Sequence, residues 1–198
     1  MKGNNKLYLV LLCVFIFSCS SENKKDIKDS ENSYKIFRQE NLGWKSRQVM
    51  HFSNDIQYRA TEVPIEYYLL KNMGSENLQL IDSLSKKYAL ERIIEFEFEH
   101  INNADLLKAE YTSMDYDKSV MYMAATIKND FVAVTESNDT IPCSGVQFER
   151  HFKVSPFKRV LLYFGGIPAN ENIQLIYRDR LFNNGIFKYK FNEIPFKT

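Results

Sequence analysis

The chain of 198 residues carries nearly balanced charge, with 26 Lys and Arg against 25 Asp and Glu and a net charge of +1. This balance argues against a protein that binds nucleic acid or an anionic membrane through a concentrated basic face. Hydrophobic residues make up 44% of the chain, including 15 Phe and 12 Tyr, which is enough to build the hydrophobic core of a single domain.

Residues 1–18 have the pattern of a secretion signal. Lys2 and Lys6 supply a positive start, and an apolar run of eleven residues follows at 7–17. A membrane-spanning helix needs about 20 apolar residues, so this run is too short to be one. We therefore expect residues 1–18 to be a signal peptide that is removed from the mature protein.

The end of this segment, Ile16-Phe17-Ser18-Cys19, resembles the lipobox of bacterial lipoproteins. The resemblance implies cleavage just before Cys19, attachment of acyl chains such as palmitate to that cysteine, and a lipid-anchored mature protein. Ser20, which stands where a retention signal has Asp, implies delivery to the outer membrane of a Gram-negative cell envelope. An ordinary secretory signal, cleaved near Ser18 and left without lipid, is the alternative.

Residues 19–35 comprise the lipidated cysteine and a polar, mixed-charge stretch, which we expect to be a disordered tether. After cleavage and lipidation Cys143 would be left as a free thiol, which excludes a disulfide scaffold for the monomer. We therefore expect residues 36–198 to form a single globular domain that is held together by its hydrophobic core.

Strands and helices are both predicted in the first part of this domain, residues 36–90. Residues 49–52 and 56–59 can pair as strands around a turn at 53–55. A pair of short helices is then predicted before a series of strands begins.

Proline, glycine and serine mark the ends of these two helices. Pro64 favours the first turn of a helix that continues to about Met73, and Gly74 can close it. Ser75 is a candidate N-cap for a second helix that reaches about Ala89. Apolar residues recur in it at three- and four-residue spacing, so one face is expected to pack against a larger element.

From Arg92 the hydrophobic period changes from helical to two. Apolar residues alternate with Glu95, Glu97 and Glu99, which predicts a strand with one buried face and one acidic, solvent-facing face. Further strands are predicted at residues 120–127, 131–135, 146–152, 160–164, 173–177 and 186–191, with turns at 128–130, 165–168 and 184–185.

Short strands at this spacing predict that residues 91–198 are rich in β-structure. The fold class is therefore mainly β, a β-sandwich for which the immunoglobulin-like arrangement is one model. With the short helical pair on its N-terminal side, the domain is α+β overall.

Cys143 is the first candidate for chemistry, because it could act as a nucleophile beside His51, His100 or His151. No known cysteine-hydrolase signature surrounds it, and a lone thiol is usually a small buried hydrophobe. We favour the packing role, and no catalytic residue is assigned.

Carboxylates offer a second possibility, a metal site. Asp115 and Asp117 would lie on one side of an extended segment and could bind a hard cation, but the spacing of an EF-hand is absent. The three histidines are scattered singly, which argues against zinc. We therefore predict no metal and no other cofactor.

A basic cluster interleaved with phenylalanines consists of Arg150, His151, Lys153, Lys158 and Arg159. Such a mixture could bind nucleic acid or an acidic partner. Two other interpretations stay open: the charges could solvate the outer face of two strands, or they could pair across strands with the glutamates at 95–99.

Two hypotheses for function follow. The one that we favour is a lipid-anchored, non-catalytic binding or assembly module, with the membrane, other envelope proteins or glycans as partners and no nucleic acid. The alternative is an envelope hydrolase, acting for example on glycans, that uses Asp115, Asp117, Glu99 or His151. Its carboxylates would have to converge to about 5 to 10 Å.

Overall fold

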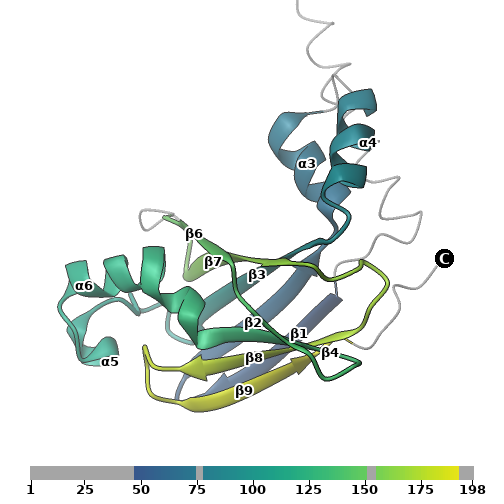
Figure 1. Ribbon diagram of the computed structural model, residues 1–198. Coiled ribbons are helices and arrows are strands. Elements are labelled where there is room, and N and C mark those ends of the chain that lie inside the picture. The colour runs from purple at the N-terminus through teal and green to yellow at the C-terminus, as the bar shows by residue number, and fades with distance from the viewer. Residues whose placement is uncertain (1–46, 75–77, 151–154, 192–198) are drawn as a thin grey trace, which may run out of the picture. The chain divides into compact units, whose positions relative to one another are not determined.

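Two antiparallel β-sheets form most of the structure (Figure 1). The computed structural model describes residues 47–74, 78–150 and 155–191. The signal segment, Cys19, the tether, Ser75, His151 and Lys153 therefore lie outside the described residues. Because the two sheets share one core and helices accompany them, the predicted mainly β sandwich is confirmed.

Sheet A has the strand order β1-β2-β3-β7-β6, and sheet B has the order β5-β4-β8-β9. The strands of sheet A are β1 (Arg47–Ser53), β2 (Ile56–Val63), β3 (Glu91–His100), β7 (Phe157–Gly165) and β6 (Gly145–Glu149). Those of sheet B are β5 (Thr140–Pro142), β4 (Phe131–Thr135), β8 (Ile173–Asp179) and β9 (Gly185–Lys190). An immunoglobulin constant-type sandwich has four and three strands, in place of the five and four found here.

The predicted hairpin of β1 and β2 is confirmed, and its turn shows why. Ser53 pairs with Ile56, which leaves Asn54 and Asp55 as the two loop residues. Both have positive φ, 47° and 61°, a conformation that Asn and Asp adopt more readily than most residues.

The predicted helical pair is also confirmed, as α3 (Ile65–Met73) and α4 (Leu78–Lys87). Pro64 precedes α3 with φ −58°, and Gly74 closes it at φ 70°. Ile81 of α4 is buried, and α4 packs against α3, which in turn packs against β3. None of the helices among the described residues has the length and apolar character needed to cross a membrane.

The strand predicted at residues 120–127 is wrong, because this segment is helical. It contains α6 (Tyr116–Met121), a π-helical turn (Tyr122–Thr126) and a 3₁₀ turn (Ile127–Asp130), after the short α5 (Ala109–Thr112). Asp115 caps α6 by accepting a hydrogen bond from the Lys118 amide at 2.9 Å. Ser119, Met123 and Ile127 are buried at a spacing of four, which is a helical period. The predicted turn at 128–130 is the end of this helical segment.

Aromatic side chains from both sheets fill the core. Phe96 of β3 lies 4.9 Å from Phe131 and 5.1 Å from Tyr177, between ring centroids. The rings of Phe131 and Tyr177 stack at 4.4 Å. The apolar face predicted for β3 is therefore confirmed, because its alternating side chains meet those of sheet B.

Two edges of the sandwich are covered. On one side β1 lies beside β9, where Arg47 donates to the Phe191 carbonyl at 2.6 Å and the His51 ring hydrogen-bonds to the Lys188 carbonyl at 3.0 Å. On the other side the helical segment 122–130 lies against β6. Covered edges oppose the addition of a strand from another chain.

Buried charge closes one end of sheet A. Arg92 and Glu62 form an ion pair there, and both side chains are buried. Arg92 also donates to the carbonyls of Pro168 at 2.7 Å and Glu171 at 3.0 Å. These contacts offset the cost of removing the guanidinium from water.

A second buried carboxylate, Asp179 at the end of β8, joins the two sheets. It accepts five hydrogen bonds of 2.9 to 3.2 Å, from the hydroxyls of Tyr58 and Tyr177 and the amides of Leu181, Phe182 and Asn184. Tyr58 belongs to β2 in sheet A, whereas Tyr177 belongs to β8 in sheet B. Burial, with Asp179 beside them, raises the pKa of both tyrosines, so both donate at neutral pH.

We predict that Asp179→Asn lowers the free energy of unfolding by about 3 kcal/mol. In the variant, the side-chain NH₂ group of the asparagine would replace one carboxylate oxygen. It cannot accept the hydrogen bonds that this oxygen accepts now, so their buried donors would be left unpaired. Urea unfolding at neutral pH measures the change, with the exposed Asp117→Asn as the matched control, expected to stay within about 0.5 kcal/mol. Equal stabilities of the two variants would contradict the role of Asp179.

Candidate functional site

The two residues of the predicted basic cluster that belong to a strand do not lie on the same surface. Lys158 and Arg159 are neighbours on β7, so their side chains point to opposite faces of sheet A. Lys158 forms an ion pair with Asp105 at 3.1 Å, and Arg159 binds glutamates on the other face. Arg150 is exposed just after β6, outside any strand. The structure therefore corrects the cluster by separating Lys158 from Arg159.

Arg159 belongs to a row of charges that crosses the outer face of sheet A. Cross-strand pairing aligns Arg59, Glu97, Arg159 and Glu149 from β2 to β6. Glu97 lies between the two arginines, at 2.6 Å from Arg59 and 2.5 Å from Arg159, and Arg159 reaches Glu149 at 3.2 Å. Burial alone would lower the pKa of Arg159, but these glutamates raise it. Of the interpretations left open for the basic cluster, pairing across strands with the glutamates at 95–99 therefore holds for Arg159.

Glu97 also corrects the prediction of a solvent-facing acidic face on β3. Its side chain is only 7% exposed, whereas that of Glu99 is 28% exposed. The alternating pattern predicted which residues of β3 share a face. It did not predict that two long arginine side chains would cover Glu97 on that face.

We predict that Glu97→Ala lowers the free energy of unfolding by about 2 kcal/mol, because it leaves two partly buried guanidinium groups without their shared carboxylate. Glu99→Ala is the control on the same strand face, where a single ion pair of 3.7 Å with Arg59 is lost. Its expected effect is within about 0.5 kcal/mol. Chemical denaturation of both variants tests the difference, and equal losses would show that the burial of Glu97 has no energetic consequence.

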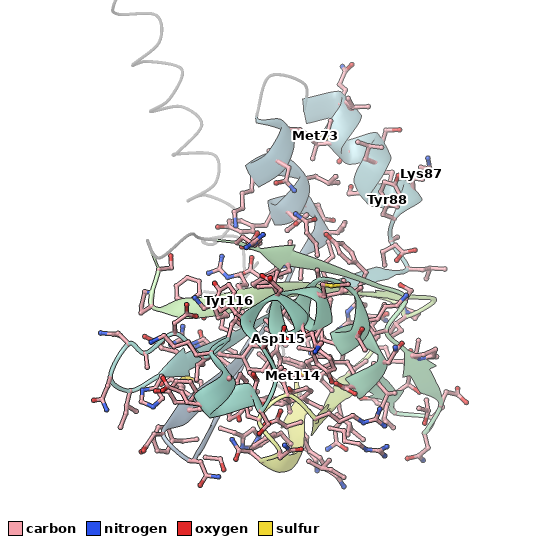
Figure 2. All side chains as sticks on the ribbon, turned by 90° about the vertical axis from the view of Figure 1, so that its left-hand side faces the viewer. Met73, Lys87, Tyr88, Met114, Asp115 and Tyr116 are labelled. Atoms are coloured by element: carbon pink, nitrogen blue, oxygen red, sulfur yellow. The ribbon has the colours of Figure 1, made fainter. Side chains whose placement is uncertain are left out.

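Of the carboxylates proposed for hydrolysis or metal binding, Asp115 and Glu99 form structural contacts, and Asp117 is an exposed residue of α6. Asp115 stands at the start of α6, as Figure 2 shows, where it caps the helix and binds Lys118 at 2.7 Å. Hydrogen bonding to Lys118 lowers the pKa of Asp115, the opposite of the shift that a general acid needs. Glu99 pairs with Arg59. Among the described residues no group of acidic, histidine and cysteine side chains is arranged to hold a metal ion.

One carboxyl group that the sequence analysis missed, Asp130, has a raised pKa because it is buried. Tyr122 donates a short hydrogen bond to its Oδ2, and Nε of Arg180 lies 3.4 Å from its Oδ1. Both oxygens are therefore occupied. Asp130 fastens the end of the helical segment to the residue that follows β8, and no motif around it predicts this contact.

We predict that Asp130→Asn removes one component of the pH dependence of stability. Because the pKa of Asp130 is higher in the folded protein, the folded state binds a proton here at pH values where the unfolded chain does not. The contribution of Asp130 to the free energy of unfolding therefore increases as the pH falls from the raised pKa of the folded protein towards the ordinary aspartate pKa of about 3.9.

Urea unfolding of both proteins between about pH 4 and pH 7 tests this sign, because the other carboxyl groups are common to both. The free energy of unfolding of the wild type, relative to that of Asp130→Asn, should rise as pH falls. A difference that is constant or has the opposite slope would contradict the assignment.

Cys143 has the packing role expected from the sequence. It is 8% exposed, and its thiol donates to the Gly145 carbonyl at 3.0 Å. Burial raises the pKa of Cys143, which disfavours the thiolate that a nucleophile requires. The two described histidines have other partners, since His51 packs on Tyr189 and His100 on Tyr111.

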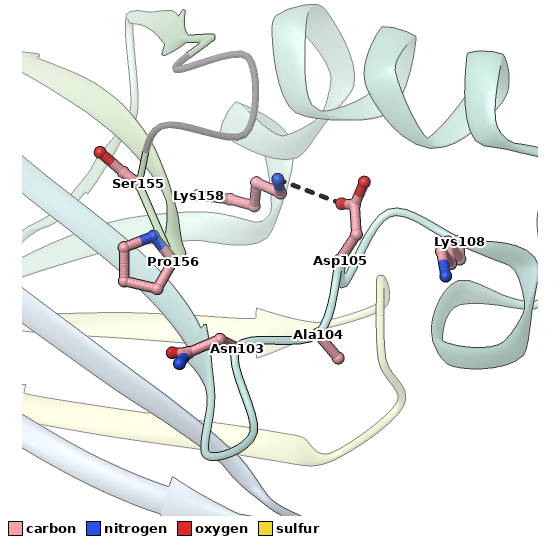
Figure 3. A pocket seen from close by; sticks show the side chains of 7 residues that line it. All are labelled: Asn103, Ala104, Asp105, Lys108, Ser155, Pro156 and Lys158. Atoms are coloured by element: carbon pink, nitrogen blue, oxygen red, sulfur yellow. Dashed lines mark ion pairs between the residues drawn. The ribbon is translucent and has the colours of Figure 1, made fainter.

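The candidate site is a hollow between the loop after β3 and the start of β7 (Figure 3). Its volume is about 530 Å³, within the range usual for small-molecule sites. The residues that line it are Asn103, Ala104, Asp105, Lys108, Ser155, Pro156 and Lys158. Among the described residues of the predicted basic cluster, Lys158 is the one that lines this hollow.

Lys158 is held in position at this hollow. Its side chain is 16% exposed and that of Asp105 is 20% exposed, and the ion pair joins the loop to the strand. An ammonium group has three protons, so Lys158 can bind Asp105 and still donate to a ligand. Lys108, whose side chain is 60% exposed and lies 3.9 Å from Glu110, adds a second ammonium group. The lining therefore suits a polar ligand that carries an anionic group.

Comparison with known proteins places this chain in no family. No protein-family model and no curated protein matches it. Among solved structures it is similar to a DUF4426 family protein from Pseudomonas aeruginosa PAO1, at 8% sequence identity and a TM-score of 0.40, over 74% of this chain and 93% of that one. A similarity this low supports no inference about function.

Proposed function

We propose that this protein is a lipid-anchored lipoprotein of the cell envelope, on the outer membrane, that binds a ligand without catalysis. The anchor would be Cys19, and the support for it is the signal segment that ends in Ile16-Phe17-Ser18-Cys19. Two or more acyl chains hold a protein to a bilayer stably, and each buried methylene contributes about 0.8 kcal/mol. No transmembrane helix is needed in this arrangement.

The observation that carries the binding role is the immobilised Lys158 at the hollow. Asp105 restrains the ammonium group before any ligand arrives, which reduces the entropy that binding would cost. Ser155 and Asn103 supply a hydroxyl and an amide beside it. An acidic glycan combines hydroxyl groups with a carboxylate or phosphate, so it matches this set of donors and acceptors, and we take it as the ligand class.

The chemistry of the lining favours binding over hydrolysis. Its carboxylate, Asp105, is paired with Lys158, and the described lining residues include no histidine that could act as a base for Ser155. Among the buried acids of the described residues, Asp130 and Asp179 have both oxygens engaged, Glu97 is paired with arginines and Glu62 is paired with Arg92. A hydrolase would have to use groups other than these, so the hydrolase hypothesis becomes an outcome of the test.

An array of acidic and neutral glycans, probed with the labelled protein, tests this proposal. We expect retention on acidic glycans, loss of that retention in Lys158→Ala, and no loss in Lys118→Ala, which removes an exposed lysine from α6. Mass spectrometry should recover the bound glycans intact. Equal retention of both variants, or no retention at all, would contradict the site, and shortened glycans would favour the hydrolase.

A further inference from the structure

The outer face of sheet B combines an apolar centre with basic side chains. In each strand of sheet B, every second side chain points away from the core. Cross-strand pairing places these outward side chains in rows across the sheet. The set is Thr140, Pro142, Val132, Val134, Gln174, Ile176, Arg178, Ile186, Lys188 and Lys190. We call it the outer B face. Its members include no acidic residue.

The charges of this face lie together on one side. Lys188 and Lys190 are exposed on β9, and Arg178 is exposed on the neighbouring β8. Neither lysine forms an ion pair with any residue in the part of the chain that the structure describes. Ile186 is 58% exposed beside Arg178. The balanced net charge of the chain therefore conceals a local positive field.

The acidic groups near this face are not members of it. Asp179, at the end of β8, is buried. Glu136, in the turn between β4 and β5, accepts a hydrogen bond from Asn172 just before β8, and Asp139 accepts one from Ser137 in the same turn. Asp130, on which Arg178 acts electrostatically, is buried. An anionic surface that approaches β9 would thus meet cations first.

A second copy of this chain is a poor occupant. In a symmetric dimer each patch faces itself, and this patch has no acidic member that could pair with Lys188 or Lys190 of the other copy. Like charges that are brought together in this way cost free energy. The occupant has to carry negative charge.

We propose that the outer B face lies on an anionic phospholipid surface, that of the bilayer in which Cys19 is anchored. The proposal rests on the proposed anchor, which would keep the domain within reach of the headgroups. Each Lys or Arg near an anionic bilayer surface strengthens adsorption about fivefold, so three cations give about a hundredfold. The apolar centre and Ile186 would contact the interfacial region of the bilayer.

This orientation would direct sheet A and its helices away from the membrane. Sheet A lies on the other side of the core from the outer B face, and α3 packs on its outer side through Tyr68, near Tyr163, and Lys71, paired with Glu95. The hollow is built from the loop that follows β3 and from the residues at the start of β7, both of which adjoin sheet A. Ligands from the aqueous side could therefore reach it.

Lysine footprinting on the native lipidated protein tests the proposal. The full mature chain is reconstituted into vesicles of phosphatidylcholine, with and without phosphatidylglycerol, labelled with an amine-reactive reagent and analysed by mass spectrometry. Labelling of Lys188 and Lys190 should fall several-fold in the anionic vesicles, and high salt should restore it. Lys86 of α4, whose side chain is 78% exposed, is the internal control and should not change.

Unchanged labelling of Lys188 and Lys190 in anionic vesicles would overturn the proposal, and so would equal protection in both kinds of vesicle. The same labelling can be carried out on whole cell envelopes. Protection of the two lysines there, but not in anionic vesicles, would indicate that an acidic protein covers the face and would also overturn the proposal. Failure of the anchor gives a different result, since the protein would then not float with the phosphatidylcholine vesicles. Anionic vesicles added to that unanchored protein still test the outer B face.

Discussion

The carboxylate of Asp179 is the constraint on which the sandwich depends most. A polar side chain in a core is tolerated only when hydrogen bonds replace its hydration, and five donors do so for Asp179. Two of the donors are tyrosine hydroxyls from opposite sheets, and three are amides of the chain between β8 and β9. One side chain therefore sets the spacing of the sheets and the path of the last hairpin.

Charged residues elsewhere also form contacts within the fold. Arg92 and Glu62 close one end of sheet A, and Glu97 holds two arginines on its outer face. The basic and acidic residues that stand out in the sequence are thus largely paired with each other. Groups with donors to spare are found at the hollow, at Lys158, and on the outer B face, which explains why the proposals concern these places.

The sequence predicted elements wherever a local signal has one physical meaning. Asn54 and Asp55 adopt positive φ readily, and Pro64 with Gly74 delimits a helix, so the first hairpin and this helix were predictable. The tight turn predicted at 184–185 is wrong, because the loop between β8 and β9 spans residues 180–184 and Gly185 already pairs with Asp179. Residues 120–127 were not, because a short apolar run fits a strand or a buried helix equally well. The capping by Asp115 was the signal that would have decided between them.

The candidate site was less predictable than the fold. Adjacency on a strand put Lys158 and Arg159 in one cluster, although neighbouring strand residues face opposite sides. Asp105 and Asp130 acquire their partners through contacts distant in sequence, with Lys158 and Arg180. No spacing rule in the sequence contains that information.

The most direct test of the central claim, a structural sandwich held at a membrane by Cys19, is the intact mass of the mature protein extracted from the cell envelope. The claim predicts a chain that begins at Cys19 and carries the added mass of acyl chains. A chain that begins at another residue, with an unmodified cysteine or none, would contradict it.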